Sequence, residues 1–265
     1  MKPARSGRQD RPRTDRYHAC GYRYVSMRKI GGPLVLASAV LGAAHVAPAP
    51  RRRWPVGVIF PRILRLATDN AVALTFDDGP GPGLDAFLDL LEGVKARATF
   101  FVAGEQVERD PSRVREITSR GHEVGVHCYR HRNHLFMTPA GAVEDMRRAK
   151  SVIEEAAGRP TRLFRPPYGR FTLASWLEAG RQGWERVLWT RDGQDHAAWA
   201  TPQSIAESIG WPTAGDILLL HDSDRYGTTG SWHATLEALP TLLERIDSLA
   251  LRACSVGELL AAEAH

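Results

Sequence analysis

From residue 71 onward, short apolar runs alternate with segments whose apolar residues recur at helical spacing. The apolar runs, which predict strands, cover residues 71–76, 98–102, 122–126, 163–164, 187–189 and 217–220. The helical segments cover residues 84–91, 111–120, 138–158, 172–179 and 232–248, and another helix begins at 201–202. The clearest helix has Thr138 as its cap, Pro139 at its first position and Gly158 at its end. Alternating buried strands and helices predict a parallel sheet covered by helices, either a barrel or an open doubly wound sheet.

Polar side chains follow several of these predicted strands, where such folds place their chemistry. Asp77 and Asp78 follow the first strand, and adjacent carboxylates there let one hold a metal while the other faces the reactants. An ordinary acidic turn is the alternative. His127 and His131 are spaced to lie on one side of a helical turn, close enough to share a divalent ion. Cys128 lies between them, and we expect its side chain to point away.

Three later segments add to this edge of the sheet. Arg165 follows the fourth strand and precedes Pro166 and Pro167, which stiffen the turn so that the guanidinium is held in place. His221 directly follows the apolar run 217–220, and Asp192 and Asp195 follow the run 187–189. Carboxylates, imidazoles and an arginine are therefore expected together at the carboxyl ends of five strands.

The order and spacing of these segments resemble a known family. The segments are Thr75–Pro80 (TFDDGP), His127–His131, Arg165–Tyr168 (RPPY), Asp195 and Leu219–His221. They look like the five motifs of the polysaccharide deacetylase family, the NodB-homology domain of carbohydrate esterase family 4. The resemblance runs from about Val72 to the end of the chain. It implies a distorted (β/α) barrel with roughly seven parallel strands, which agrees with the alternation above.

The resemblance also implies a metal site. Asp78, His127 and His131 would hold Zn²⁺, or another divalent ion such as Co²⁺, Ni²⁺ or Mn²⁺. The implied activity is hydrolysis of acetyl groups from an acetylated carbohydrate, such as the N-acetylated amino sugars of a polysaccharide, peptidoglycan or sugar conjugate.

Five further residues carry catalytic roles by the same resemblance. Asp77 would be the general base, kept ionised by Arg165. The backbone N–H of Tyr168 would stabilise the oxyanion. His221 would be the general acid that protonates the leaving group, and Asp195 would orient it.

The sequence departs from the family pattern in three places. His196 follows Asp195 where the family usually has an aromatic residue, which leaves Asp192 as the alternative partner of His221. Cys128 stands where the family usually has Ser or Thr. The loop after His221 is rich in polar residues; we expect it to be a solvated loop, with contact to substrate as the alternative. A sugar-binding groove would have exposed aromatic residues, for which the candidates are Tyr168, Trp199, Tyr226 and Trp232.

Two alternatives to N-deacetylation remain. The same site could hydrolyse O-acetyl esters of a xylan-like polymer or an amide of a non-sugar compound, and a small amide predicts a closed pocket. A non-catalytic domain that binds a glycan or a metal is the alternative of another class. The complete set of expected base, acid and metal ligands argues against this last alternative.

The N-terminal part differs from the rest in charge. Through Arg53 the chain has 12 basic and 2 acidic residues, whereas the remainder has 23 basic and 28 acidic residues. This distribution argues against a nucleic-acid-binding body. We expect residues 1–26 to be a disordered basic arm or an extension upstream of a start at Met27.

A targeting segment is expected next. A short basic stretch, the apolar run from Ile30 to Ala47 and small residues after it predict that residues 27–50 are a signal peptide or membrane anchor, followed by a linker over 51–70 and the catalytic domain over 71–265. Residues 27–53 would then contact a membrane, and the enzyme would be secreted or anchored facing the cell envelope; a cytoplasmic location is the alternative. Three cysteines, Cys20, Cys128 and Cys254, provide no disulfide framework.

Overall fold

The computed structural model describes residues 31–50 and 56–263 of the 265-residue chain. It divides into two units, Met1–Ala39 and Val40–His265. The first unit is described only through the beginning of helix α1 (Gly31–Val46). The basic arm over residues 1–26 and Cys20 lie outside the described residues. Among the described helices, none has the length and apolar character needed to cross a membrane.

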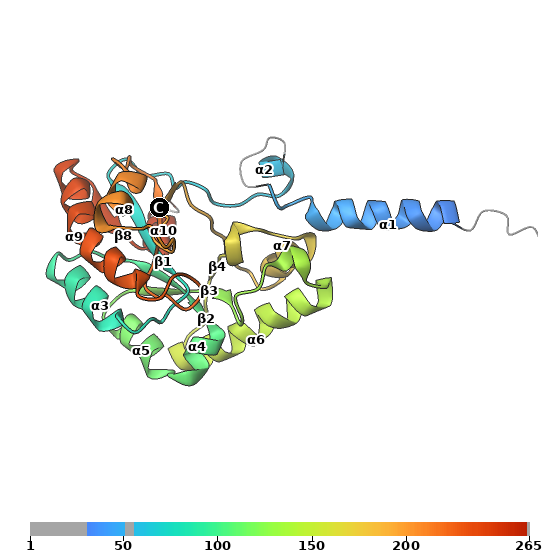
Figure 1. Cartoon of the computed structure of the whole chain (residues 1–265), viewed down its shortest axis with the longest axis horizontal. Helices are drawn as coiled ribbons and strands as arrows, with labels where there is room; N and C mark the ends of the chain where they lie inside the picture. Colours follow the sequence, from blue (N-terminus) through green and yellow to red (C-terminus); the bar gives the residue numbers. More distant parts are fainter. Residues whose placement is uncertain (1–30, 51–55, 264–265) are drawn as a thin grey trace, which may run out of the picture. The chain divides into compact units, whose positions relative to one another are not determined.

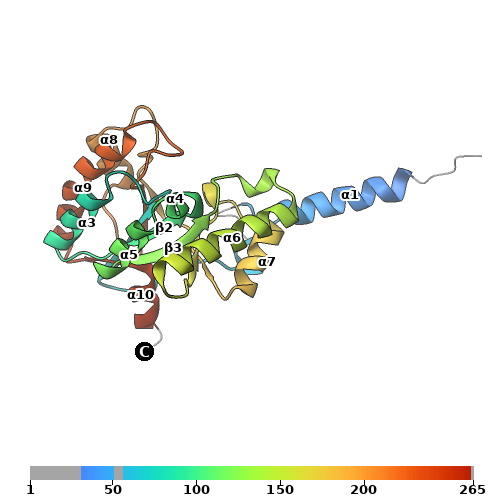
Figure 2. The same ribbon diagram turned by 90° about the horizontal axis from the view of Figure 1, so that it is seen from below.

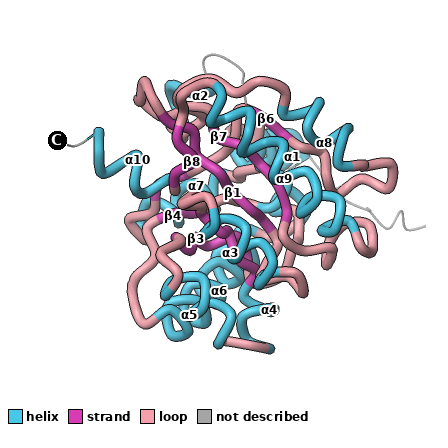
Figure 3. Tube along the Cα trace, turned by 90° about the vertical axis from the view of Figure 1, so that its left-hand side faces the viewer, coloured by secondary structure: helices cyan, strands magenta, loops and turns pink. Residues whose placement is uncertain are grey.

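The second unit is built on one sheet whose strand pairs are all parallel, as Figure 3 shows in magenta within a shell of helices. The strand order is β5-β4-β3-β2-β1-β7-β6, and β8 pairs with the beginning of β1. The strands are β1 (Ala71–Asp77), β2 (Thr99–Ala103), β3 (Glu123–Cys128), β4 (Leu163–Phe164), β5 (Glu185–Arg186), β6 (Arg191–Asp192), β7 (Ile217–His221) and β8 (Arg252–Cys254). Seven strands in a curled, parallel path with helices around them confirm the expected distorted (β/α) barrel.

Helices connect the strands and cover the sheet (Figures 1 and 2). Helices α4 and α5 lie beside β2 and β3, α6 packs along β3 and α7, and α8 packs against α9. The helices of the second unit are α2 (Val56–Ile59), α3 (Leu84–Gly93), α4 (Gly104–Arg109), α5 (Ser112–Ser119), α6 (Pro139–Ala157), α7 (Leu173–Arg181), α8 (Pro202–Ile209), α9 (Ser231–Ser248) and α10 (Val256–Glu263).

The local signals in the sequence explain the best-defined elements. All seven residues of β1 are buried, because both faces of this central strand are covered. Helix α6 begins where expected: the Thr138 hydroxyl accepts a hydrogen bond from the Gly141 N–H at 3.1 Å. The helix ends at Gly158, which has a φ of 65° in the left-handed region.

Some expectations about elements were wrong. The apolar run 187–189 forms no strand; it lies between β5 and β6, where Val187 forms a single bridge to Ile63 and its N–H donates to the Phe164 carbonyl at 2.9 Å. These residues are buried because they form part of the core, so apolarity alone misled the assignment. The short elements α4, β8 and α10 were not expected from the sequence.

Residues 63–66, in the expected linker, contact the domain expected over residues 71–265. The Ile63 N–H donates to the Arg186 carbonyl at 2.8 Å, and the Leu66 N–H donates to the Gly215 carbonyl at 2.9 Å. Part of the segment 51–70 therefore packs on the sheet-bearing unit.

The register of the sheet brings the expected functional residues to one edge. Asp77, the last residue of β1, is paired with His221 of β7 on one side and with Phe101 of β2 on the other. His127 lies near the end of β3, which pairs with β2. The carboxyl ends of neighbouring parallel strands therefore surround a single site.

Candidate active site

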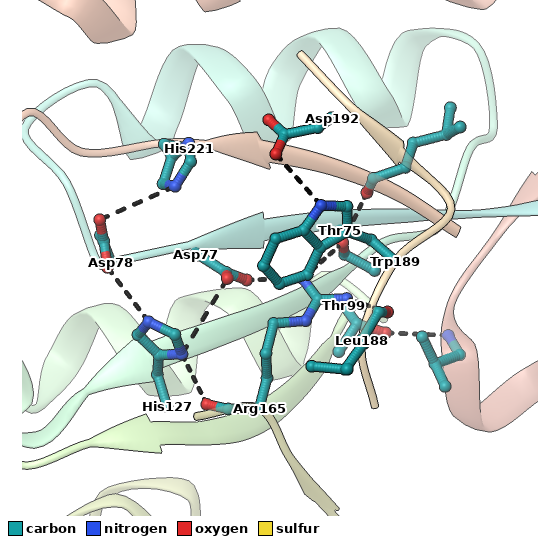
Figure 4. Close-up of polar contacts among 12 residues, drawn as sticks. Thr75, Asp77, Asp78, Thr99, His127, Arg165, Leu188, Trp189, Asp192 and His221 are labelled. Carbon is teal, nitrogen blue, oxygen red and sulfur yellow. Dashed lines mark hydrogen bonds and ion pairs between the residues drawn. The ribbon is translucent and has the colours of Figure 1, made fainter. Parts of the chain in front are cut away.

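Asp77 is the last residue of strand β1 and Asp78 follows it, and their buried carboxylates face different partners. Asp77 pairs with Arg165, whereas Asp78 faces His127 and His221 (Figure 4). Asp78 has a φ of 75°, a left-handed conformation that an L-residue adopts at an energetic cost. This turn of the backbone separates the directions of the two adjacent carboxylates.

His127 and His131 approach each other without the expected helical turn. Strand β3 continues through Cys128, so His127 is extended and His131 belongs to the loop that follows. The loop folds back because the Asp145 carboxylate accepts hydrogen bonds from the Tyr129 N–H at 2.8 Å and from the next N–H at 3.1 Å. The two imidazole centroids end 5.2 Å apart.

Cys128 takes no part in this cluster. Its side chain is buried, and burial raises the pKa of its thiol well above the usual value. Its sulfur is not among the potential ligand atoms that converge with those of Asp78, His127 and His131.

Asp78, His127 and His131 form a group suited to a divalent ion. The Nε2 atoms of the two histidines lie 3.3 and 3.4 Å from Oδ1 of Asp78, and the three potential ligand atoms lie within 4.8 Å of one another. Oδ1 of Asp78 is buried and has no hydrogen-bond partner among the described residues. Burial raises the pKa of Asp78, but contact with His127 and the nearby imidazole charges outweigh burial and hold the pKa below its usual range. One carboxylate and two imidazoles fit the ligand preferences of Zn²⁺.

Arg165 fixes Asp77 through its guanidinium (Figure 4). Its side chain is 0% exposed, and Nη1 donates to Oδ1 of Asp77 at 2.7 Å and to the Thr75 hydroxyl at 2.8 Å. Nη2 donates to the Leu188 carbonyl at 3.1 Å, and the guanidinium lies 4.1 Å from the Phe101 ring centroid. These contacts leave Oδ2 of Asp77 facing His127, whose Nδ1 is 4.0 Å away.

His221 lies on the other side of Asp78 and is held by Asp195. The Asp195 carboxylate contacts Nδ1 of His221 at 2.7 Å and accepts from the His221 backbone N–H at 2.7 Å. The Thr235 hydroxyl also donates to this carboxylate, at 2.8 Å. Nε2 of His221 then faces Asp78 at 3.9 Å. Asp192, the alternative partner, instead accepts from the Trp189 indole at 3.1 Å.

This pair makes folding stability depend on pH. Burial lowers the pKa of His221, but the Asp195 carboxylate outweighs burial and raises the pKa from 6.5 to about 10. Between these values the folded protein keeps a proton that the unfolded chain releases. The contribution of the pair to folding stability is therefore complete below pH 6.5 and is lost as the pH rises through about 10.

We expect the free energy of unfolding of the metal-free protein to fall across this window, by at most about 1.4 kcal/mol per pH unit from this group. Urea titrations of the wild type and His221→Asn measure the effect. The stability difference between them should shrink as the pH rises, and a difference that stays constant contradicts this account.

Tyr168 lies at the rim of the site. It belongs to the 3₁₀ turn Pro167–Gly169, has a φ of 59° and is 55% exposed. Its ring centroid lies 4.6 Å from that of His131. The structure thus places this residue beside the proposed metal ligands.

The loop after β7 is only in part the solvated loop expected from the sequence, because Arg225 and residues 227–229 are exposed whereas its beginning is buried. Asp222 is fully buried and accepts a hydrogen bond from the Gly81 N–H at 3.0 Å, and burial raises its pKa to about 7. A Cβ on Gly81 would lie 1.8 Å from the Asp222 carbonyl oxygen, so this close approach requires glycine. Tyr226 is half-buried and stacks on His131. The sequence carried no signal for these contacts, because they join residues far apart in the chain.

The structure also shows where His196 and the remaining candidate groove aromatics lie. His196 is exposed, and its ring centroid lies 5.3 Å from that of His221. Of the candidate groove aromatics, Trp199 is exposed, whereas Trp232 packs against the hydrophobic core.

A parallel barrel-like sheet that carries these five motifs at the carboxyl ends of its strands defines the class of carbohydrate esterase family 4 deacetylases. Comparison with known proteins agrees. The model of the family described as Polysaccharide deacetylase matches residues 66–187. The chain is 36% identical over 199 residues to a peptidoglycan-N-acetylglucosamine deacetylase from Bacillus cereus, a match that covers 72% of this chain and 89% of the relative. The chain therefore belongs to the polysaccharide deacetylase family.

Two further relatives bear on substrate and activity. A chitin deacetylase from Colletotrichum lindemuthianum is 28% identical over 237 residues, which cover 84% of this chain and 91% of the relative. A family 4 pseudoenzyme from Bacillus anthracis has a TM-score of 0.68 and 25% identity, with 76% of this chain and 69% of that chain covered. Because the family includes a pseudoenzyme, family membership alone does not establish catalysis. Catalysis depends on the base, the acid and the metal ligands that this chain itself carries.

Proposed function

We propose that this protein hydrolyses the N-acetyl groups of amino sugars in a glycan and that it requires a divalent ion at Asp78, His127 and His131. One observation carries the proposal. A carboxylate fixed by a buried arginine lies beside His127, and an imidazole fixed by a buried carboxylate lies beside Asp78, so both adjoin the three potential ligands. Figure 4 shows Asp77, Asp78, His127, Arg165 and His221 of this arrangement. A hydrolase that cleaves an amide needs such a base and acid around one reacting carbon.

Asp77 is the proposed base. A divalent ion bound at the site would polarise the acetyl carbonyl and make water more acidic. Oδ1 of Asp77 is occupied by Arg165, which leaves Oδ2 to accept a proton from the attacking water. The buried guanidinium holds the carboxylate in place, so Oδ2 stays directed toward the site.

His221 is the proposed acid. Asp195 holds Nδ1 and favours the protonated imidazole, so that Nε2 can donate a proton toward the site. When the carbon–nitrogen bond breaks, this proton passes to the departing nitrogen. The products are acetate and a free amine, and the backbone N–H of Tyr168 is the proposed donor to the oxyanion formed before cleavage.

Support for a glycan substrate comes from the surface beside the site. An open hollow of about 510 Å³ adjoins His131, and Tyr168 and Phe136 are among the residues that line it. Phe136 is 88% exposed, so its flat apolar ring is free to pack on a sugar. An open hollow favours a polymer over the closed pocket that a small amide would need. The relatives named for peptidoglycan and chitin support the same choice.

The proposed place of action is the cell envelope, where such polymers occur. The apolar character of residues 30–47 and the basic residues on both sides of them support export or anchoring. Recovery of the active enzyme only from the cytoplasmic fraction of its host would contradict this proposal.

Acetate release from a panel of substrates tests the proposed function. The panel contains N-acetylglucosamine oligomers, peptidoglycan, acetylated xylan and a small N-acetyl amide, each with the metal-loaded full chain. We expect release from the first two. Release only from acetylated xylan, or only from the small amide, would show that the site acts on that alternative substrate. Metal binding without any release would indicate a non-catalytic domain.

A further inference from the structure

The two imidazoles of the proposed metal site are oriented in different ways. Nδ1 of His127 lies 2.7 Å from the Arg165 carbonyl oxygen, so a backbone hydrogen bond fixes this ring with Nε2 toward Asp78. Nδ1 of His131 is buried but has no hydrogen-bond partner in the described part of the chain. Metal-binding histidines usually donate their second N–H to an acceptor that sets the orientation of the ring. A ring contact from a neighbouring residue can supply the orientation instead.

Tyr226 provides a contact of the required kind. Its ring stacks on the His131 imidazole with centroids 4.7 Å apart and an interplanar angle of 17°. The Tyr226 hydroxyl donates a hydrogen bond to the Glu105 carboxylate, which fixes the ring at its far end. Tyr168 also contacts His131, but its plane is tilted by 57°.

The loop that carries Tyr226 is anchored at several points. Asp222 accepts from the Gly81 N–H at 3.0 Å at its beginning, and Asp224 accepts from the Gly230 N–H at 2.6 Å across its base. Thr228 donates to the His196 carbonyl through its N–H and its hydroxyl, each at 3.1 Å. These hydrogen bonds hold the loop against the turn after β1 and against the segment that contains Asp195. The backbone that carries Tyr226 is therefore fixed in position.

We propose that Tyr226 is a positioning residue that holds His131 in the orientation needed to bind the metal, and that Glu105 in turn holds Tyr226. The inference rests on the proposed function, because it requires a divalent ion at Asp78, His127 and His131. Stacking replaces the hydrogen bond that His131 lacks. The loop that carries Tyr226 begins directly after His221, so the same loop joins the proposed acid to the contact on His131.

Metal affinity, measured by competition with a chromophoric chelator, tests the inference with Zn²⁺ and Co²⁺. Tyr226→Leu removes both the ring and the hydroxyl, and we expect the Kd to rise by about 10- to 100-fold. Tyr226→Phe keeps the stacked ring but loses the hydrogen bond to Glu105, so we expect the Kd to rise several-fold, less than in Tyr226→Leu. Arg225→Ala, an exposed change in the same loop, is the matched control and should not alter the Kd. The Co²⁺ absorption spectrum of Tyr226→Leu should also change, since the spectrum reports the ligand geometry.

Kinetics separates positioning from contact with substrate. We expect the acetate-release activity of Tyr226→Leu to recover largely when the metal is raised to saturation, with little change in the KM for the glycan. An unchanged Kd in a folded Tyr226→Leu protein overturns the inference, as does a raised KM for the glycan with normal metal binding. If Tyr226→Leu does not fold, Glu105→Ala provides the test: a Kd raised several-fold supports the inference and an unchanged Kd overturns it. Failure of the wild type to bind metal would refute the proposed function instead.

Discussion

Asp77→Asn is expected to lower kcat/KM for acetate release by about 10²- to 10⁴-fold. The amide can still accept a hydrogen bond from Arg165, but it cannot take a proton from water. Because Asp77 is not among the three potential ligands, the Kd for the metal should change little. Steady-state acetate release and a chelator competition measure the two quantities separately.

Asp192→Asn is the matched control, because Asp192 lies at the same edge of the sheet but bonds to the Trp189 indole. It should keep most of the activity. Equal losses in the two variants would indicate a general electrostatic effect and remove the case for Asp77 as the base. Near-normal activity in Asp77→Asn would have the same consequence.

Arg165→Met is expected to lower the free energy of unfolding by about 3–5 kcal/mol, because it leaves the Asp77 carboxylate buried without its partner. The substitution also leaves the Thr75 hydroxyl and the Leu188 carbonyl without the guanidinium. Arg165→Lys keeps a charge but not the planar fork, so an intermediate loss is expected. Urea unfolding of the metal-free protein at neutral pH provides the measurement.

The double variant Arg165→Met, Asp77→Asn identifies the cause of this loss. Neutralising Asp77 removes the unpaired charge, so the double variant should be more stable than Arg165→Met alone. A double variant that is less stable than Arg165→Met by the full cost of Asp77→Asn would show that the two side chains do not interact.

Much of the site could be predicted from sequence, because its residues follow strands that meet at one edge. The run 71–76 is apolar throughout and the run 217–220 ends at His221, so both patterns located a strand end. Parallel pairing then placed Asp77 opposite His221 in the register of the sheet. Capping signals also predicted helix α6 correctly, because Thr138 and Gly158 each act only on the adjacent turn at their own end of the helix.

The rest depended on contacts that no local pattern encodes. The run 187–189 was predicted as a strand because buried loop residues are as apolar as strand residues. His127 and His131 meet through a loop that Asp145, from α6, folds back, rather than through a helical turn. Tyr226 and Glu105 are 121 residues apart, so their hydrogen bond and the stacking on His131 required the folded chain.

The pseudoenzyme among the structural relatives makes the role of the metal the central question for this chain. The most direct test is acetate release from N-acetylglucosamine oligomers by the full chain after chelation, and again after addition of Zn²⁺ or Co²⁺, beside Asp78→Asn. We predict no release from the metal-free protein, recovery on addition of the ion, and no recovery in Asp78→Asn. Undiminished release from protein shown to contain no metal would contradict the account.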